Sequence, residues 1–327
     1  MRQSVPKTIT LARELVELAE SENDPAKLAV AQRALGYSLF VAGDFREAIE
    51  FLNRGVALAD ALSDREFEVY GEHPGMVCRI YAAQTKILMG FTETGAPLIE
   101  AAIAHARDEK SAHSLAWALG VAAHSLVTQG EAQATVCFAS EAIDTAREHR
   151  LPQWLALGER CKGWAISRLG ELEAGLNLQQ AGVTRWYETG AVLHTTHCEL
   201  ILAETYLRGG QFGMARSHLE TARAHRARYG EGYLAAEIDR VGAVLLQHEG
   251  APVEIVEEHL TNALITARRQ EARLLELRAA LTLARMLVER KARHEAIDLL
   301  MPIYGWFTEG FDTADLKEAK ALLAELA

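Results

Sequence analysis

The sequence predicts an all-α protein built as a solenoid of helical hairpins, and three observations carry this prediction. Alanine, leucine and glutamate dominate the 327 residues, whereas runs of β-branched residues are scarce, a composition that favours helix over strand. Glycines that follow helix-like segments recur every 40 residues. Small residues recur at fixed positions around those glycines. Such an array stacks its repeats side by side instead of closing one globular core.

The 40-residue period is carried by glycines that end segments such as KILMG and LVTQG. Five of them are evenly spaced: Gly90, Gly130, Gly170, Gly210 and Gly250. An earlier turn at Gly43 and a later one at Lys291 complete a set of seven. Glycine accepts the positive φ that ends many helices, so each turn is predicted to end the first helix of a hairpin.

Small residues frame the turns on both sides. Those seven positions before a turn are Gly36, Ala83, Ala123, Gly163, Ala203 and Ala243. Those five positions after a turn include Ala48, Gly95, Gly175, Ala215 and Ala296. Because small side chains let helix backbones approach closely, these positions predict the packed face of each hairpin. Pro25 and Pro152 predict helix starts, with proline at the first helical position.

The repeats fill one domain, residues 1–327, without a linker or a shift in composition. We expect an N-terminal helix within residues 1–25, about seven hairpins over residues 26–303 and a C-terminal cap over residues 304–327. The cap contains YGWFTEGF, whose aromatic residues are expected to cover the open apolar end of the last hairpin before a final helix begins near Thr313. The most loop-like segment is FEVYGEHPG, between the first two turns.

The stretch ALGYSLFVAGDFREAIEFLNRGVALA resembles a tetratricopeptide repeat (TPR), with its Leu35-Gly36 pair, turn Gly43, Phe45 and Ala48. LAETYLRGGQFGMARSHLETA repeats this pattern. The period here is 40 residues, compared with about 34 in that family, so longer helices are expected. The resemblance implies an all-α, right-handed α-solenoid of about seven TPR-like hairpins, with an N-terminal helix and a C-terminal capping helix.

Four stretches resemble the C-terminal helical-repeat region of a bacterial signalling family: VYGEHPGMVC, AAEIDRVGAVLL, ELRAALTLARML and GWFTEGFDTADLKEAKALLAEL. Members of that family join a cyclase or DNA-binding output domain to a STAND-type ATPase, which is followed by such repeats. The resemblance covers nearly the whole chain and implies a sensor or protein-interaction arm. The sequence has no G-x-x-x-x-G-K-[ST] phosphate loop and no counterpart of a cyclase's metal-binding aspartates, so it resembles the arm alone.

The net charge bears on the classes of partner, and the cysteines bear on the cellular compartment. The formal net charge of −11 repels phosphate backbones and anionic membranes, which predicts no nucleic-acid and no membrane partner. The four cysteines, Cys78, Cys137, Cys161 and Cys198, are isolated, as expected for reduced thiols in a cytoplasmic protein. The start of the chain lacks a signal-peptide pattern, and no apolar run is long enough to span a bilayer.

The densest group of candidate metal ligands is HTTHC, residues 194–198. His194 and Cys198 would share a helix face beside His197, and zinc accepts these ligand types. The alternative is a polar helix start in which Cys198 packs as a small hydrophobic residue. No fourth ligand, Ser/His/Asp order or HExxH spacing is present. We therefore predict no metal, no cofactor and no catalytic residue, in a protein that is not an enzyme.

The concave surface is the better candidate for function, because the first helix of each stacked hairpin lines it. Aligning the repeats on the small residue before each turn selects three inward-facing rows. The candidate partner-binding residues from these rows are Arg33, Tyr37, Gln84, Trp117, His124, Arg160, Trp164, His197, Glu204 and Arg240. Aromatic residues could anchor an apolar segment, and arginines could hold carboxylates. Alternatively, the tryptophans pack between helices and the arginines pair with neighbouring acids.

Three functions remain open. The first is a non-catalytic interaction or sensor module that binds a peptide or protein segment, such as another domain of the same signalling polypeptide. The second is a small-molecule-sensing domain that holds a metabolite between the HPG segment near His73 and the inner tryptophans. The third is an enzyme with an unrecognised site. A long open channel would favour a peptide, and a closed pocket of roughly 300–1,000 Å³ would favour a metabolite.

Overall fold

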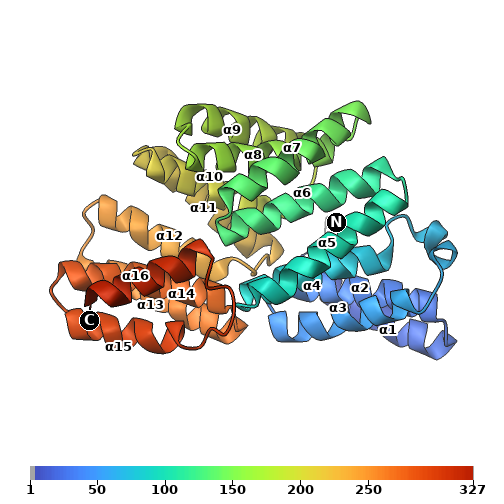
Figure 1. The fold of residues 1–327 in the computed structure, drawn as a ribbon, viewed down its shortest axis with the longest axis horizontal. Coiled ribbons are helices and arrows are strands. Elements are labelled where there is room, and N and C mark those ends of the chain that lie inside the picture. The colour runs from blue at the N-terminus through green and yellow to red at the C-terminus, as the bar shows by residue number, and fades with distance from the viewer. Residues whose placement is uncertain (1–3, 327) are drawn as a thin grey trace.

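The computed structural model describes residues 4–326 of the chain, and these form sixteen α-helices and one 3-10 helix, with no strand. The inner helices are α2 (Pro25–Ala42), α4 (Pro74–Leu88), α6 (Ala112–Gln129), α8 (Pro152–Arg168), α10 (Thr195–Arg208), α12 (Ala235–His248) and α14 (Arg273–Glu289). The outer helices are α3 (Phe45–Asp60), α5 (Thr92–Asp108), α7 (Ala132–Glu148), α9 (Leu172–Glu188), α11 (Phe212–Tyr229), α13 (Val253–Gln270) and α15 (Arg293–Tyr304). With α1 (Val5–Glu22) and α16 (Ala314–Leu326), they form the predicted all-α array of seven hairpins between two terminal helices (Figure 1).

The turn residues and the proline at the start of α2 have the conformations that the sequence predicts. Each recurrent turn residue has a positive φ, from 108° at Gly170 to 61° at Lys291, and lysine tolerates this left-handed conformation less well than glycine. Helix α2 begins at Pro25, where the Asp24 carboxylate accepts the backbone N–H groups of Ala26 and Lys27. None of the described helices is long and apolar enough to cross a membrane.

The small residues bring helix backbones into direct contact, most closely between α8 and α9. A Cβ atom on Gly163 would lie 2.3 Å from the backbone nitrogen of Gln179, and one on Gly175 would lie 2.4 Å from that of Ser167. The neighbouring atoms are backbone atoms, so they cannot turn aside as a side chain would. Glycine is therefore required at these two positions.

The segment expected to be most loop-like is partly helical. Residues Asp64–Tyr70 form the 3-10 helix η1, which begins with a capping box between Ser63 and Glu66. Phe67 anchors this helix because its side chain is buried against α2 and α3 residues such as Ala29 and Ala59. The prediction missed η1 because the glycines and the proline of this segment lie just after it.

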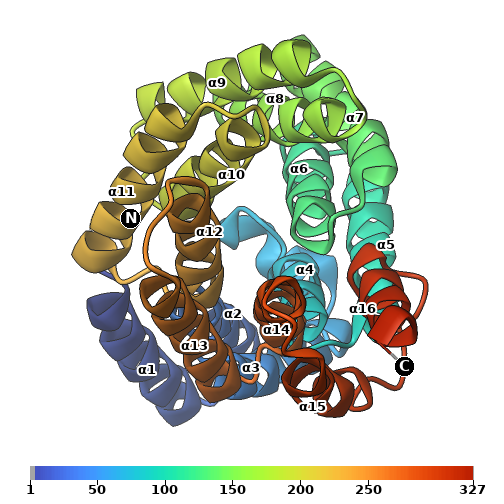
Figure 2. The same cartoon turned by 90° about the vertical axis from the view of Figure 1, so that its left-hand side faces the viewer.

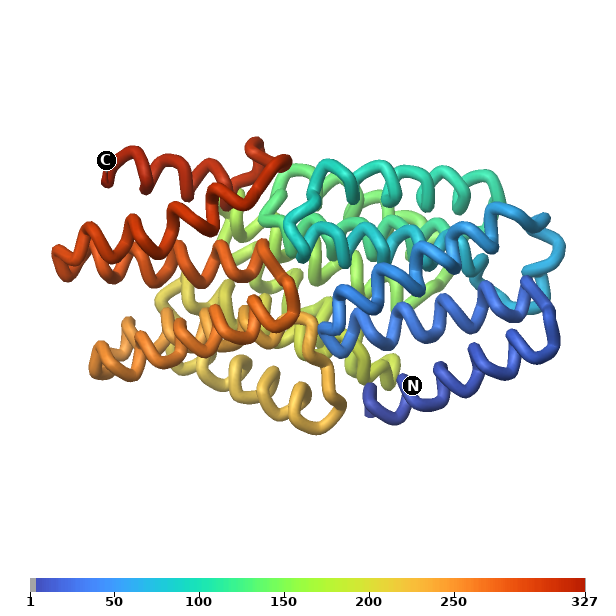
Figure 3. The backbone as a smooth tube through the Cα atoms, turned by 90° about the horizontal axis from the view of Figure 1, so that it is seen from below, coloured from blue at the N-terminus to red at the C-terminus, as the bar shows by residue number. Residues whose placement is uncertain are grey.

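The array curls through about one superhelical turn, so α13–α16 lie beside the first hairpins (Figures 1 and 3). Figure 2 looks into the resulting ring. Arg46 forms an ion pair with Glu271 (2.5 Å), and Nη2 of Arg278 donates to the carbonyl oxygen of Thr128 (2.7 Å). These contacts join repeats that are far apart in sequence, so the array is fastened to itself and is not an open arc.

The aromatic segment after α15 contributes to this closure. Phe307 packs into the core of α13–α16, as expected for an end cap. Trp306 remains 37% exposed and contacts Phe91, at the start of α5, with the ring centroids 5.6 Å apart. The Glu309 carboxylate accepts the backbone N–H of Thr94 (2.9 Å). The segment therefore covers the last hairpin and also attaches it to the second one.

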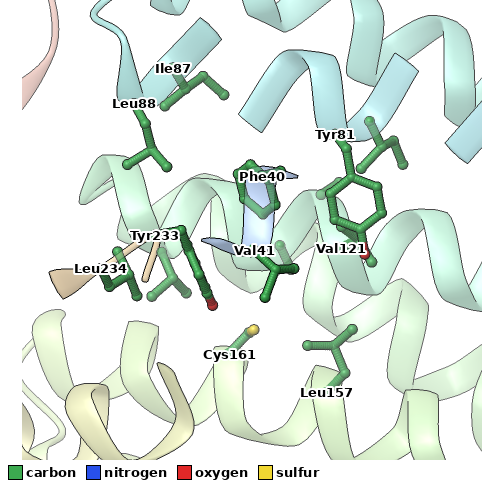
Figure 4. Packing of buried hydrophobic residues seen from close by; sticks show 14 of the residues in the cluster. Phe40, Val41, Tyr81, Ile87, Leu88, Val121, Leu157, Cys161, Tyr233 and Leu234 are labelled. Carbon is green, nitrogen blue, oxygen red and sulfur yellow. The ribbon is translucent and has the colours of Figure 1, made fainter. Parts of the chain in front are cut away.

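A second closing contact crosses the interior. The loop of residues 230–234 between α11 and α12, which we call the bridging loop, reaches the end of α2, where the Gly232 N–H donates to the Val41 carbonyl (2.8 Å). Tyr233, 1% exposed, lies among inner-helix side chains such as Phe40 and Cys161 (Figure 4). The middle of the ring is therefore filled by side chains and is not a continuous channel.

Candidate ligand-binding interior

The filled middle leaves two interior cavities. The first has a volume of about 500 Å³ and lies between α2, α4, α6 and α8, closed on one side by the loop of residues 189–194. Its aromatic wall consists of Tyr37, Tyr81, Trp117, Trp154 and Trp186. The second cavity, about 740 Å³, lies between α6, α8, α10, α12, α14 and α16. We call them the aromatic cavity and the charged cavity.

All ten residues predicted from the inward-facing rows lie at or between these cavities. Those that line the aromatic cavity are Arg33, Tyr37, Gln84, Trp117, His124 and Arg160. Those that line the charged cavity are Trp164, Glu204 and Arg240. His197 lines neither, but its ring stacks on that of His124 with centroids 3.9 Å apart. The rows thus point inward, although the bridging loop divides them into two groups.

In the charged cavity, arginine and carboxylate side chains pair with one another. Arg240 pairs with Glu204 (2.8 Å) and Glu237 (2.7 Å), and Arg278 pairs with Asp315 (2.8 Å). Burial by itself lowers the pKa of each guanidinium, but the neighbouring carboxylates outweigh this effect and raise the pKa of both arginines. Both guanidinium groups therefore stay charged. Arg240 therefore follows the alternative interpretation, in which an arginine pairs with neighbouring acids.

Arg160, in the wall of the aromatic cavity, differs from Arg240. Its side chain is 1% exposed, yet it forms no ion pair within residues 4–326. The buried carboxylate of Glu231 interacts with it electrostatically, but this carboxylate accepts the backbone N–H groups of His194 and Thr196 instead. It donates instead to Nδ1 of His124 (3.2 Å) and to the Cys198 sulfur, and its guanidinium lies 4.9 Å from the Trp186 ring centroid. A buried charge without a counter-ion is costly, so this position favours an anionic group.

Three histidines and one cysteine next to Arg160 are neutral at pH 7. Burial, together with the Arg160 charge, lowers the pKa of His194 to about 3. Burial raises the pKa of the Cys198 thiol to about 12, only partly offset by Arg160. Burial also lowers the pKa of His124 and of His197, with contributions from Arg160. None of these four side chains therefore supplies a counter-charge to the guanidinium.

This geometry also bears on the metal hypothesis for HTTHC. His194 hydrogen-bonds through Nδ1 to Tyr233 (3.2 Å) and through Nε2 to Tyr37 (3.0 Å). His197 and Cys198 face the Arg160 guanidinium, whose charge repels a cation. The alternative interpretation, a polar helix start with Cys198 packed inside, describes the segment better.

We expect His124, His194 and His197 to make the protein less stable as the pH falls. Their folded pKa values lie below the ordinary 6.5, so between pH 6.5 and 5 the unfolded chain binds protons that the folded chain does not. Each imidazole then removes about 1.4 kcal/mol of stability per pH unit. Unfolding in urea at pH 7.5, 6 and 5 measures this slope.

In that experiment His194→Asn should lower the slope by the contribution of one imidazole, up to about 1.4 kcal/mol per pH unit, because asparagine tolerates the φ of 61° at this position and does not titrate. Exposed His149, at the end of α7, serves as the matched control, since His149→Asn should leave the slope unchanged. A stability that does not change between pH 7.5 and 5 would contradict the assignment.

A surface groove continues from the aromatic cavity. This groove of about 440 Å³ includes His113, Pro152, Arg185 and Glu188. It shares Gln153, Trp154 and Thr189 with the aromatic cavity. Trp154 therefore stands where the two spaces meet, and a ligand could extend from Arg160 past this ring to the surface.

The prediction missed several residues of the cavity. Trp154 lies in the first turn of α8, outside the three rows, and Trp186 lies on the outer helix α9. The only available signal was the presence of tryptophans near helix ends. His73, which was expected beside the inner tryptophans, does not line the cavity. Its ring packs instead against His105, with centroids 4.2 Å apart, whereas its neighbour Glu72 reaches the cavity wall.

Comparison with known proteins identifies the fold. No family model and no curated protein matches the sequence. Among solved structures, a Rap protein complexed with competence and sporulation factor has a TM-score of 0.58 at 13% identity, covering 98% of this chain and 87% of that one. The Rap conjugation gene regulator of plasmid pLS20, in complex with the Phr* peptide, has a TM-score of 0.58 at 12% identity, covering 91% and 76%.

Aspartyl phosphate phosphatase F from Bacillus subtilis has a TM-score of 0.55 at 12% identity, with 88% of this chain and 73% of that chain covered. Identities this low establish a shared fold and nothing more. The chain is thus a TPR-like helical-repeat protein, which confirms that part of the sequence resemblance. These three structures do not bear on the STAND-type ATPase or cyclase context.

Proposed function

We propose that the chain is a recognition module that binds an extended peptide segment in the aromatic cavity and the adjoining groove, with a carboxylate of the segment next to Arg160. The observation that carries the proposal is this buried, unpaired guanidinium in an aromatic wall. A hydrogen-bonded ion pair with a ligand carboxylate would supply the missing counter-charge. Arg33, held only by Glu72 at 3.6 Å, offers a second cation at the same wall.

Size and shape favour a peptide over a compact metabolite. The aromatic cavity alone, about 500 Å³, falls within the usual range for small-molecule pockets. It continues past Trp154 into the groove, so the full site accepts a segment of several residues. The complex of the pLS20 regulator with the Phr* peptide supports the idea that this fold can hold a peptide. A small-molecule-sensing domain remains the second candidate, because the aromatic cavity by itself has the volume of a small-molecule pocket.

The same proposal includes the cellular location of the module and the kind of partner that it binds. We place it in the cytoplasm of a bacterium, as the sensor or interaction arm of a signalling protein, where the bound segment belongs to a partner protein or to another domain of the same polypeptide. We assign it recognition without turnover. Its net charge of −11 argues against nucleic acid as the partner.

Selection from a library of random peptides with free C-termini tests this proposal. Affinity for a selected peptide, measured by fluorescence anisotropy, should fall at least about 30-fold in Trp154→Ala, because a central buried aromatic anchor contributes about 2 kcal/mol or more. Arg54→Ala on outer helix α3, which is exposed, should bind as the wild type does. If selection yields only peptides whose binding is indifferent to Trp154, the proposal is wrong.

A further inference from the structure

A group of potential metal ligands lies at the outer end of the second hairpin, away from both cavities. Asp64 of η1, His73 at the start of α4 and His105 in the last turn of α5 each place one ligand atom within 4.8 Å of the others. Nε2 of His73 lies 3.4 Å from Oδ1 of Asp64. Three elements thus converge on one point.

One of these side chains has an unused buried nitrogen. His73 is 5% exposed, and its Nε2 has no hydrogen-bond partner within the described residues. A buried polar atom without a partner destabilises the folded state. The packing of the ring against Phe67 (4.8 Å between centroids) and His105 (4.2 Å) fixes its direction toward the other two ligands.

We propose that Asp64, His73 and His105 bind one divalent transition-metal ion of the zinc type. Two imidazoles and a carboxylate form an accepted donor set for zinc, with water as the fourth ligand. Ligand atoms around tetrahedral zinc lie about 3.4 Å apart, which is the separation already present between His73 and Asp64. His105 needs to move by no more than about 1.4 Å to join them.

The surroundings favour a cation. Oε1 of Glu109 lies 3.2 Å from Nε2 of His105, and carboxylates commonly orient the imidazole ligands of zinc in this way. The nearby cation, Arg79, is already paired with Asp60.

Zinc binding removes one hydrogen bond of His73. Nδ1 of His73 accepts the backbone N–H of Met76 at 3.4 Å, and ligation through Nε2 moves the ring proton to Nδ1. The long hydrogen bond at the start of α4 is then lost. Three bonds from protein ligands to zinc outweigh the loss of this one hydrogen bond. The ion would attach η1 to α4 and α5.

Titration of ZnCl2 into the metal-free full chain, followed by calorimetry, tests the site. The wild type should bind one ion with a micromolar or lower Kd. Asp64→Asn should raise this Kd at least tenfold and His105→Ala should abolish binding, while His149→Ala and Cys137→Ser, at exposed positions, should not change it. Co²⁺ should give visible absorption bands in the wild type that are lost in His105→Ala.

Folding can be separated from binding in the same experiment. Asp64 is 73% exposed, so Asp64→Asn without metal should melt at the same temperature as the wild type. With zinc present, only proteins that retain the site should gain thermal stability. The proposal is overturned if Asp64→Asn and His105→Ala bind zinc as the wild type does, or if the wild type binds none at 1 mM.

Discussion

Gly163→Ala is expected to lower the melting temperature by roughly 2–4 °C, the largest effect on stability that we foresee for a single methyl group. The added Cβ would lie 2.3 Å from the backbone nitrogen of Gln179 and 2.6 Å from the carbonyl oxygen of Gly175. Both are backbone atoms of α9, so the two helices must separate. Overpacking of this kind costs about 1–3 kcal/mol. In a chain of 327 residues, about 1 kcal/mol shifts the midpoint of thermal unfolding by about 1.5 °C.

Gly213→Ala provides the matched control. Gly213 also lies in a helix, α11, but a Cβ there would meet no atom within 4 Å. Alanine should therefore leave the melting temperature unchanged or raise it slightly, because it lowers the entropy of the unfolded chain. If Gly163→Ala melts together with Gly213→Ala, the α8–α9 contact is not as close as described. Because α8 also carries Trp154 and Arg160, the same substitution should weaken peptide binding.

Arg160→Met is expected to have the largest effect on binding, at least about tenfold for a peptide that carries the recognised carboxylate. A hydrogen-bonded interaction with a charged group contributes about 1.5–3 kcal/mol, and 1.4 kcal/mol corresponds to a factor of ten. Methionine fills a similar volume without charge. However, Arg160 also donates to His124 and His197, so the substitution by itself would mix folding with recognition.

A double-mutant cycle separates the two. The selected peptide is compared with its analogue in which the carboxylate is replaced by the amide, on wild type and on Arg160→Met. In the wild type the amide should bind at least tenfold more weakly, whereas in Arg160→Met the two peptides should bind alike. Equal carboxylate-to-amide ratios in the two proteins would show that Arg160 is only structural.

The hairpins could be predicted because their signals are local. A turn glycine acts on its own helix end, and the small residues at Gly163 and Gly175 act on the neighbouring helix. These features depend on helical geometry over a few turns, so a 40-residue period is sufficient to place them. The alignment of the repeats on these small residues also placed Tyr37, Trp117 and Arg160 on the inner face, where they line the aromatic cavity.

Closure of the ring could not be predicted in this way. The contacts of Gly232 with Val41 and of Glu309 with Thr94 depend on the accumulated curvature of several repeats. A small change in the angle of each repeat would separate these residues, and no local pattern encodes that sum. For the same reason, the sequence indicated one groove, whereas the bridging loop makes two cavities.

The sequence predicted which residues line the inner wall, but it did not predict their pairing, and their role in binding stays a prediction. Arg33, Arg160 and Arg240 were equivalent candidates, and only their partners distinguish them. Arg240 is neutralised by Glu204 and Glu237, whereas Arg160 forms no ion pair within the described residues and donates to His124 and Cys198. Which acid meets which arginine depends on the superhelical arrangement and cannot be read from spacing.

The most direct measurement of the central claim is hydrogen–deuterium exchange of the full chain with and without a selected carboxylate-bearing peptide. Binding in the aromatic cavity predicts slower exchange in the loop of residues 189–194, in the first turns of α8 around Trp154, and in the last turn of α9 around Trp186. Outer helices away from the site, such as α3 and α13, should exchange as before. Protection confined to those outer helices, or none at saturating peptide, would contradict the account.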